Sequence, residues 1–225
     1  MEAIILAGGK GTRLRPVISD IPKPMAPING RPFLEYVVDS LVRGGIDRIV
    51  MSVGYKHEKI IDHFRAEYRG IRLEYRIEDV PLGTGGAIKL ALESCVGDRV
   101  FVLNGDTYFD VDYREMYRQA SAVELAIAVK ELENFDRYGR LDIVDRRIVG
   151  VHEKIFCARG FINGGVYCMK RDLLDSVRQK KFSFERDFLE KDVLNAMAFE
   201  SRGYFIDIGI PEDYARAQIE FKNFD

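Results

Sequence analysis

The amino-acid sequence predicts an α/β fold built on a doubly wound, mostly parallel sheet with a small antiparallel extension. In the first half of the chain, apolar runs bounded by turn residues alternate with helical patterns. In the second half, several strand-like runs follow one another with short connections. Because strand–helix–strand alternation places helices on both faces of a parallel sheet, the first half predicts the doubly wound part. We expect one domain over residues 1–225.

The first half is expected to alternate strands with helices. The clearest helix is Phe33–Val42, where apolar residues recur at positions 33, 34, 37, 38, 41 and 42 and Gly44-Gly45 follows as a stop. A second helix is expected over Glu58–Tyr68, and a third opens after the glycines of 83–86 and continues through Ala87–Leu92. The predicted strands between them are Glu2–Leu6, Arg48–Val53, Arg72–Arg76 and Arg99–Leu103.

The second half is expected to form an antiparallel extension over the sheet. Its predicted strands are Glu124–Val129, Arg140–Val144, Arg147–Val151 and Phe161–Met169. An amphipathic helix is predicted over Phe184–Met197, and a last strand over Tyr204–Ile208. Pro211 then opens the final helix, in a first-turn position where its missing N–H costs nothing.

Composition and charge exclude several classes of protein. Of the 225 residues, 47% are hydrophobic, which is enough for one large core, and a net charge of −2 provides no global basic field for nucleic acid. No apolar run reaches the ~18 residues of a membrane span, and we expect no signal peptide. Cys95, Cys157 and Cys168 form no C-x-x-C pattern and are expected to be buried, reduced thiols. These observations favour the cytoplasm.

A glycine-rich loop follows the first strand. The segment Leu6–Pro16 reads LAGGKGTRLRP, and its glycines stand among the cations Lys10, Arg13 and Arg15. Glycine lets backbone approach a ligand closely, and successive N–H groups form a cup for oxyanions. The loop is not a Walker P-loop, because Lys10 precedes the last glycine, and Leu14 stands where a dinucleotide fingerprint needs a third glycine. The loop therefore predicts a polyphosphate site.

Three further residues suit phosphate and metal chemistry. Lys23 lies between two prolines, which hold the origin of a side chain that can reach a phosphate. Asp106 follows the strand Arg99–Leu103, and ligands of open α/β sheets bind at the carboxyl ends of strands. Asp106 is therefore well placed to hold Mg²⁺. Asp207 stands within an apolar strand, where an ionised carboxylate needs a partner; the alternative for it is to cap the next helix.

The loop and the following Pro22-Lys23-Pro24 together resemble the signature of the sugar-1-phosphate nucleotidylyltransferases, and the resemblance covers essentially the whole chain. It implies a Rossmann-like nucleotidyltransferase fold, related to the GT-A architecture, with no C-terminal β-helix domain. It also implies that Asp106 and Asp207 bind the metal, and that Arg13, Lys23, Asp106 and Lys154 are catalytic. The implied nucleotide-binding residues are Leu6, Ala7, Gly8, Gly9, Gly11, Thr12, Arg13, Lys23, Gly83, Thr84, Gly85 and Asn104.

The same resemblance implies a sugar-phosphate pocket in the second half, formed by Gly139, Glu153, Lys154 and Asn163. Within the family, the segments Ser19–Glu35 and Leu82–Ile88 look most like the D-glycero-α-D-manno-heptose-1-phosphate guanylyltransferases. That likeness implies GTP as the donor and a GDP-heptose for capsule, S-layer glycan or lipopolysaccharide as the product. Glu78 and Asp79 are candidates for reading the base edge.

The implied reaction joins an NTP to a sugar 1-phosphate and releases pyrophosphate. A uridylyl- or thymidylyltransferase acting on a hexose or amino-sugar 1-phosphate would use the same loop. Two other classes stay open: a glycosyltransferase, because Asp110-Val111-Asp112 has the D-x-D spacing of a metal motif, and a non-catalytic nucleotide sensor. The expected partners are GTP and the sugar 1-phosphate, with no nucleic acid and no membrane. Resemblance alone is the basis for expecting a homodimer.

Overall fold

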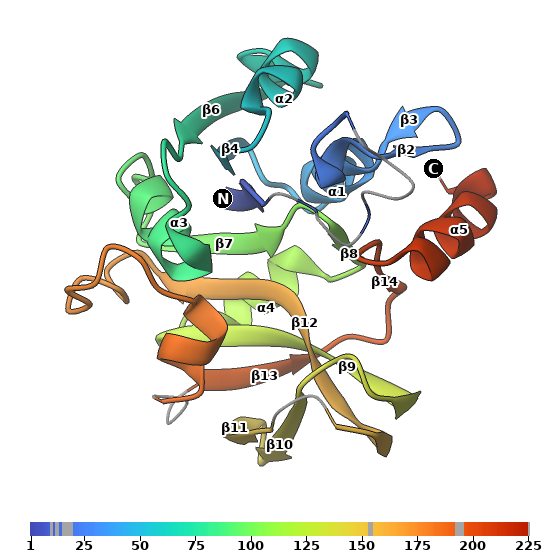
Figure 1. Cartoon of the computed structure of the whole chain (residues 1–225). Helices are drawn as coiled ribbons and strands as arrows, with labels where there is room; N and C mark the ends of the chain where they lie inside the picture. The colour runs from blue at the N-terminus through green and yellow to red at the C-terminus, as the bar shows by residue number, and fades with distance from the viewer. Residues whose placement is uncertain (10, 12–13, 15–19, 153–154, 192–195, 225) are drawn as a thin grey trace.

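The computed structural model describes residues 1–225 except 10, 12–13, 15–19, 153–154, 192–195 and 225. The strands of its main sheet are β1 Glu2–Ala7, β4 Arg48–Val53, β5 Glu67–Tyr68, β6 Ile71–Ile77, β7 Arg99–Asn104, β9 Leu125–Phe135, β10 Arg140–Val144, β11 Arg147–Val151, β12 Cys157–Lys170 and β13 Ala196–Glu200. Among the described residues, they form one sheet in the order β10-β11-β13-β9-β12-β7-β1-β4-β6-β5 (Figure 1).

Strand β1 lies at the centre of the parallel part. It pairs with β4 on one side and with β7 on the other, both in parallel, and β6 pairs in parallel with β4. Leu6 stands opposite both Ser52 and Asn104, so the carboxyl ends of these three strands reach the same edge of the sheet. That edge is where an open α/β sheet binds its ligands.

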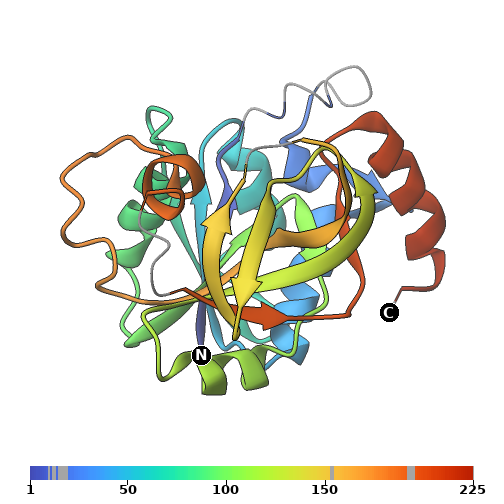
Figure 2. The same cartoon turned by 90° about the horizontal axis from the view of Figure 1, so that it is seen from below.

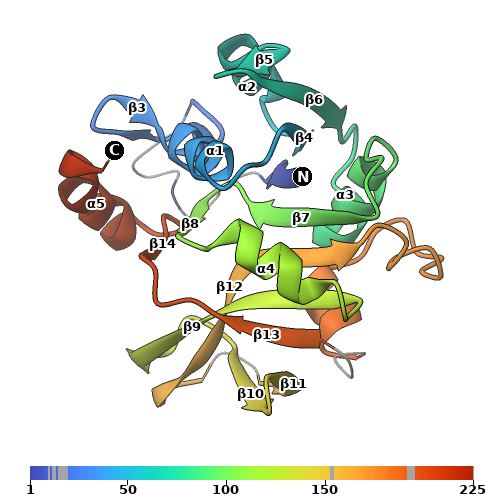
Figure 3. The same cartoon turned by 180° about the vertical axis from the view of Figure 1, so that it is seen from behind.

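Helices cover both faces of this parallel part. Ala3 and Ile5 belong to a core that includes residues of α1, α2 and α4, whereas Ile4 belongs to a second core that includes residues of α3 and the short helix η3. Successive residues of β1 thus face opposite cores, as the pleat of a strand requires. The helices are α1 Phe33–Arg43, α2 His57–Phe64, α3 Gly83–Leu92, α4 Tyr113–Ala120, α5 Pro211–Glu220 and η3 Phe184–Leu189 (Figure 3).

The second half continues the same sheet. Strand β12 is antiparallel to both β7 and β9, and β13 runs parallel to β9. The hairpin β10–β11 closes this end, and β10 also pairs with β12, so the strands curl over one another (Figure 2). The predicted fold class is confirmed, but the antiparallel extension joins the edge of the parallel sheet and does not lie over it. Two small pairs complete the fold: β2 Pro27–Ile28 with β3 Arg31–Pro32, and β8 Thr107–Phe109 with β14 Phe205–Asp207.

Two predicted helices were too long, and a third begins earlier than predicted. The helix expected over Glu58–Tyr68 ends at Phe64, because Arg65 has a φ of 54° and the chain turns back to pair β5 with β6. The helix expected over Phe184–Met197 ends at Leu189 in the described residues, and Ala196 already starts a strand. α3 begins at Gly83 and so includes the glycines expected to precede it. The final helix begins at Pro211 as predicted.

The cysteines are free thiols in two different environments. Cys95 and Cys168 are buried, and burial raises the pKa of each thiol to about 12. Cys157 is only partly buried, so the prediction of a buried thiol was wrong there. It lies at the start of β12, where the second half of the sheet reaches solvent. No helix in the described ranges is both long and apolar enough to span a bilayer.

Candidate active site

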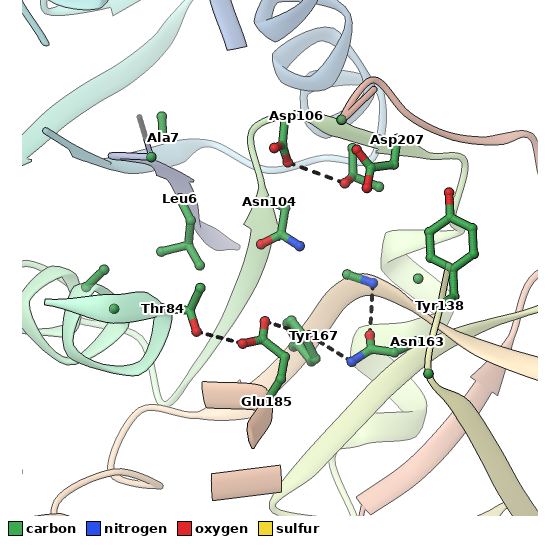
Figure 4. Close-up of a pocket in the computed structure, with 18 of the residues that line it drawn as sticks. Leu6, Ala7, Thr84, Asn104, Asp106, Tyr138, Asn163, Tyr167, Glu185 and Asp207 are labelled. Atoms are coloured by element: carbon green, nitrogen blue, oxygen red, sulfur yellow. Dashed lines mark hydrogen bonds between the residues drawn. The ribbon is translucent and has the colours of Figure 1, made fainter. Parts of the chain in front are cut away.

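A cavity of about 940 Å³ opens where the carboxyl ends of β1 and β7 meet the second half of the sheet. The close-up of Figure 4 shows that its lining comes from both halves of the chain: Leu6, Ala7, Thr84 and Asn104 from the parallel part, Tyr138, Asn163, Tyr167 and Glu185 from the extension, and Asp106 and Asp207 between them. A pocket with one wall from each half can hold two substrates side by side.

The glycine loop forms one wall of the cavity. Leu6, Ala7, Gly8, Gly9 and Gly11 line it, as expected for nucleotide contacts, while Lys10, Thr12, Arg13 and Arg15 lie outside the described residues. Gly11 has a φ of +57°, and a Cβ there would lie 2.8 Å from Cβ of Lys23. The loop therefore needs glycine at this position to pass Lys23 in a left-handed conformation.

Glu78 lies directly behind the glycine loop and also lines the cavity. Its carboxylate accepts a hydrogen bond of 3.2 Å from the Ser52 hydroxyl and one of 3.1 Å from the Leu82 N–H. A Cβ on Gly8 would lie 2.4 Å from Glu78 Oε1. The carboxylate thus ties β4 to the start of α3 and lies against the loop after β1, and it keeps lone pairs for donors that enter the cavity.

Gly83 and Thr84 form the adjacent wall, at the first turn of α3, whereas Gly85, also a predicted nucleotide-binding residue, does not line the cavity. Gly83 has a φ of +73°, and the Gly85 N–H donates to the carbonyl of Phe182 at 3.0 Å. The Thr84 hydroxyl accepts a hydrogen bond of 2.8 Å from the N–H of Phe184. These contacts bring the start of α3 against the segment that leads into η3, so the predicted nucleotide-binding glycines also join the two halves.

We expect Gly85→Ala to lower the free energy of unfolding by about 1–3 kcal/mol, as overpacking in cores does. A Cβ there would lie 2.1 Å from Cε2 of the Phe182 ring, which is 6% exposed and cannot move freely. Thermal and denaturant unfolding measure the effect. Gly9→Ala is the matched control, because a Cβ on Gly9 meets nothing within 4 Å. Equal stability of Gly85→Ala and wild type would contradict this packing.

Three charged side chains meet at the centre of the cavity. Lys23 Nζ lies 2.5 Å from Asp106 Oδ2 and 3.4 Å from Asp207 Oδ1. The Lys23 side chain is 8% exposed, whereas those of Asp106 and Asp207 are 33% and 29% exposed. Asp207 comes beside Asp106 because β14 pairs with β8 in the register that sets Asp207 opposite Thr107. Residues far apart in the sequence thus form one charge cluster.

The two carboxylates of this cluster suit a cation. Burial and the neighbouring charge of Asp106 raise the pKa of Asp207, and Lys23 offsets this only in part. In the described ranges, no group of three or more His, Cys, Asp and Glu side chains gathers to hold a metal. Two carboxylates, with substrate oxygens and water as the other ligands, are what Mg²⁺ takes in phosphoryl-transfer sites. The donor set therefore fits a hard divalent cation that binds together with a phosphate.

The opposite wall presents the residues expected to bind the sugar phosphate. Tyr138, Gly139 and Asn163 line the cavity, whereas Glu153 and Lys154 lie outside the described residues. The Asn163 side chain accepts a hydrogen bond of 2.9 Å from the Gly165 N–H and donates one of 2.9 Å to the Tyr167 hydroxyl. The amide is therefore oriented from both ends, as a residue that positions a ligand must be.

Glu185 is a cavity residue that sequence reasoning missed. Its carboxylate accepts a hydrogen bond of 2.6 Å from the Thr84 hydroxyl and one of 3.5 Å from the Tyr167 hydroxyl (Figure 4). A chain of polar side chains thus runs from Thr84 through Glu185 and Tyr167 to Asn163. The sequence alone does not indicate this role of Glu185, because the residue lies in a stretch with the pattern of an ordinary amphipathic helix, on which glutamate is expected to face solvent.

Known proteins of similar sequence place this chain in a family. The family model described as nucleotidyl transferase matches residues 2–223. The chain belongs to the nucleotidyl transferase family. One relative is the D-glycero-alpha-D-manno-heptose 1-phosphate guanylyltransferase of Aneurinibacillus thermoaerophilus. It is 47% identical over 229 residues, and the alignment covers 100% of both chains. A relative of the same name from Campylobacter jejuni is 47% identical over 218 residues, 95% of this chain and 97% of the relative.

Solved structures agree with the nucleotidyl transferase assignment. HddC from Yersinia pseudotuberculosis superposes with a TM-score of 0.91 at 42% identity, covering 98% of this chain and 99% of that one. A second structure of HddC, complexed with GMP-PN, gives a TM-score of 0.90 over the same shares. The family and enzyme class predicted from the glycine loop and Pro22-Lys23-Pro24 are therefore confirmed.

Within a nucleotidyl transferase, the D-x-D spacing of Asp110-Val111-Asp112 has another explanation. Asp112 caps α4, and its side chain accepts a hydrogen bond from the N–H of Glu115. Members of the family generally use a divalent metal ion, and in this chain Asp106 and Asp207 are the carboxylates that fit one.

Proposed function

We propose that this chain transfers the guanylyl group of GTP to D-glycero-α-D-manno-heptose 1-phosphate, forming GDP-heptose and releasing pyrophosphate. The names of the two relatives at 47% identity over nearly the full chain support this choice of substrates. The GMP-PN complex of HddC supports guanine as the base. The single structural observation that carries the proposal is the cavity with a glycine loop on one wall, Asn163 on the other and the Lys23–Asp106–Asp207 cluster between them.

The proposed nucleophile is a phosphate oxygen of the sugar 1-phosphate. The second pKa of a phosphate monoester is about 6, so at neutral pH the group is largely a dianion and needs no general base. The oxygen attacks the α-phosphorus of GTP, and the bond from that phosphorus to pyrophosphate breaks. The task of the site is to hold two polyanions together in line, so catalysis is positioning and charge stabilisation.

The chain's own residues divide this task between them. Backbone N–H groups of Gly8, Gly9 and Gly11 would cradle the triphosphate, and the Asn163 amide would orient the sugar. Lys23 would neutralise phosphate charge near the reacting phosphorus. Arg13 and Lys154 are proposed for the β- and γ-phosphates and for the sugar's phosphate, on the motif alone.

Asp106 and Asp207 are proposed to hold Mg²⁺, which when bound supplies positive charge to the phosphate oxygens. The two carboxylates would fix the position of that charge between the two substrates. Asp207 must be ionised for this role, so the raised pKa of Asp207 predicts that metal affinity falls when the pH is lowered toward that pKa.

A pyrophosphate-release screen tests the proposal. The purified chain is offered GTP, ATP, CTP and UTP, each with D-glycero-α-D-manno-heptose 1-phosphate and, in parallel, with mannose, glucose and N-acetylglucosamine 1-phosphates. We expect kcat/KM for GTP with the heptose phosphate to exceed that for every other pair by at least about 100-fold, because a site built to hydrogen-bond one base rejects analogues strongly. Preferred use of UTP or of a hexose 1-phosphate would overturn the proposed substrates and leave the enzyme class intact.

A further inference from the structure

The turn of residues 136–139, between β9 and β10, is tied to the first turn of α5 by an ion pair. Arg137 Nη2 lies 2.5 Å from Asp213 Oδ2. The Asp213 side chain is only 7% exposed, whereas that of Arg137 is 40% exposed. Arg216, one turn further along α5, lies 3.3 Å from the other carboxylate oxygen of Asp213. We call the Arg137–Asp213 contact the rim ion pair.

Each residue of the rim ion pair is close in the sequence to residues that line the cavity. On one side, Tyr138 and Gly139 follow Arg137 and line the sugar wall. On the other side, Asp213 lies six residues after Asp207, at the start of the helix that follows β14. The pair therefore joins the segment that carries a proposed metal carboxylate to the turn that borders the proposed sugar site.

A second contact fixes the same turn. The Tyr138 ring packs edge-on against Phe205, with ring centroids 5.6 Å apart, and Phe205 packs in the same manner against Phe109 at 5.5 Å. The backbone of Gly139 passes close to the residue after β11, because a Cβ on Gly139 would lie 2.8 Å from the carbonyl oxygen of His152. The turn is thus held by an aromatic contact, a close backbone approach and the rim ion pair.

The electrostatics of the pair favour a fixed geometry. Burial opposes the charge of Arg137, but the close contact with the Asp213 carboxylate outweighs it and raises the pKa of Arg137. The negative charge of Asp207 acts in the same direction. A carboxylate as buried as Asp213 is costly without a cation, so the structure retains Arg137 close to it.

We infer that the rim ion pair is a positioning device for the sugar 1-phosphate: Arg137 and Asp213 hold Tyr138 and Gly139 at a set distance from Asp207, so that the sugar's phosphate meets the metal carboxylates. This inference rests on the proposed function and deepens it. No ion pair or hydrogen bond joins Arg137 or Asp213 to the described residues of the glycine loop, so loss of the pair affects the sugar substrate and spares the nucleotide.

The test uses Arg137→Gln, which removes the charge and keeps most of the side chain. We expect KM for the sugar 1-phosphate to rise about 10-fold, as small misplacements of a substrate-positioning segment do, with KM for GTP changed less than 2-fold. Hydrogen exchange of the amides in residues 136–139 should accelerate in the same variant. Arg137→Lys keeps a cation near Asp213 and should recover part of the KM. Asp213→Asn is the second variant and should reproduce the KM pattern of Arg137→Gln.

The matched control is Arg159→Gln, which breaks an exposed ion pair with Glu131 farther from the cavity on β9 and β12. It should change neither KM nor exchange in residues 136–139. Equal rises in both KM values, or unchanged exchange of residues 136–139 in Arg137→Gln, would overturn the inference. If the wild-type chain turns over no GTP with the heptose phosphate, the proposed substrates fail, while the exchange comparison still decides whether the rim ion pair holds the turn.

Discussion

Asp106→Asn is expected to lower kcat about 10³-fold, because loss of a carboxylate proposed to bind the metal removes several kcal/mol of charge stabilisation, and each 1.4 kcal/mol is tenfold in rate. Asparagine has nearly the same shape as aspartate, and the side chain is one-third exposed, so the fold should persist. Steady-state pyrophosphate release at saturating Mg²⁺ measures the loss, and unfolding curves verify the fold.

Asp110→Asn serves as the control for this substitution. Asp110 lies four residues farther on, and its side chain is exposed to solvent. It should retain wild-type kcat. An Asp106→Asn enzyme with full activity would refute the assignment of this carboxylate to the metal.

Lys23→Met is expected to lower kcat about 100-fold, because one cation that neutralises two reacting polyanions is lost. It should also lower the free energy of unfolding in EDTA by about 1–2 kcal/mol, less than for a fully buried pair because both carboxylates are partly exposed. The physical cause is repulsion between Asp106 and Asp207. In the wild type this repulsion is offset by Lys23 Nζ, which lies 2.5 Å from Asp106 and 3.4 Å from Asp207.

Millimolar Mg²⁺ should restore part of the lost stability of Lys23→Met, because a divalent cation takes the place of the ammonium between the carboxylates. Unfolding curves with EDTA and with Mg²⁺, for wild type and variant, measure this recovery. Lys59→Met, at an exposed position of α2, is the control and should unfold like wild type in both conditions. A variant as stable as wild type in EDTA would show that the carboxylates do not need Lys23.

The parallel half could be predicted from the sequence because both faces of its strands are covered. Glu2–Leu6, Arg48–Val53 and Arg99–Leu103 each read as a short apolar run, and each became a strand with almost the predicted bounds. Hydrophobic periodicity predicts the wrong element where pairing with a neighbouring strand decides the structure. Ala196 and Met197 continue a helical pattern, yet they form β13, because β9 offers them a free edge for parallel pairing.

Most of the residues proposed for the site could be named from the sequence, because each stands in a short recognisable motif. The described residues of the glycine loop, together with Lys23, Asp106 and Asn163, line one cavity, and their roles there stay predictions. Glu185 and the rim ion pair were not predictable, because their contacts span about 100 residues for Thr84–Glu185 and 76 for Arg137–Asp213 and depend on how the two halves close. Nothing in the local sequence distinguishes such side chains from solvated surface charges.

Strand β12 has a consequence for engineering this enzyme with new sugar substrates. Its last residues pair with β7, which carries Asn104 and leads to Asp106, its middle residues pair with β10 beside the sugar wall, and β9 pairs with both of its ends. A cut between the halves, after α4, breaks no strand but separates β12 from its partner β7. Chimaeras that exchange whole halves between relatives should therefore lose stability unless β7 and β12 match, whereas grafts limited to residues 136–139 and 152–156 leave β12 unchanged and give access to altered specificity.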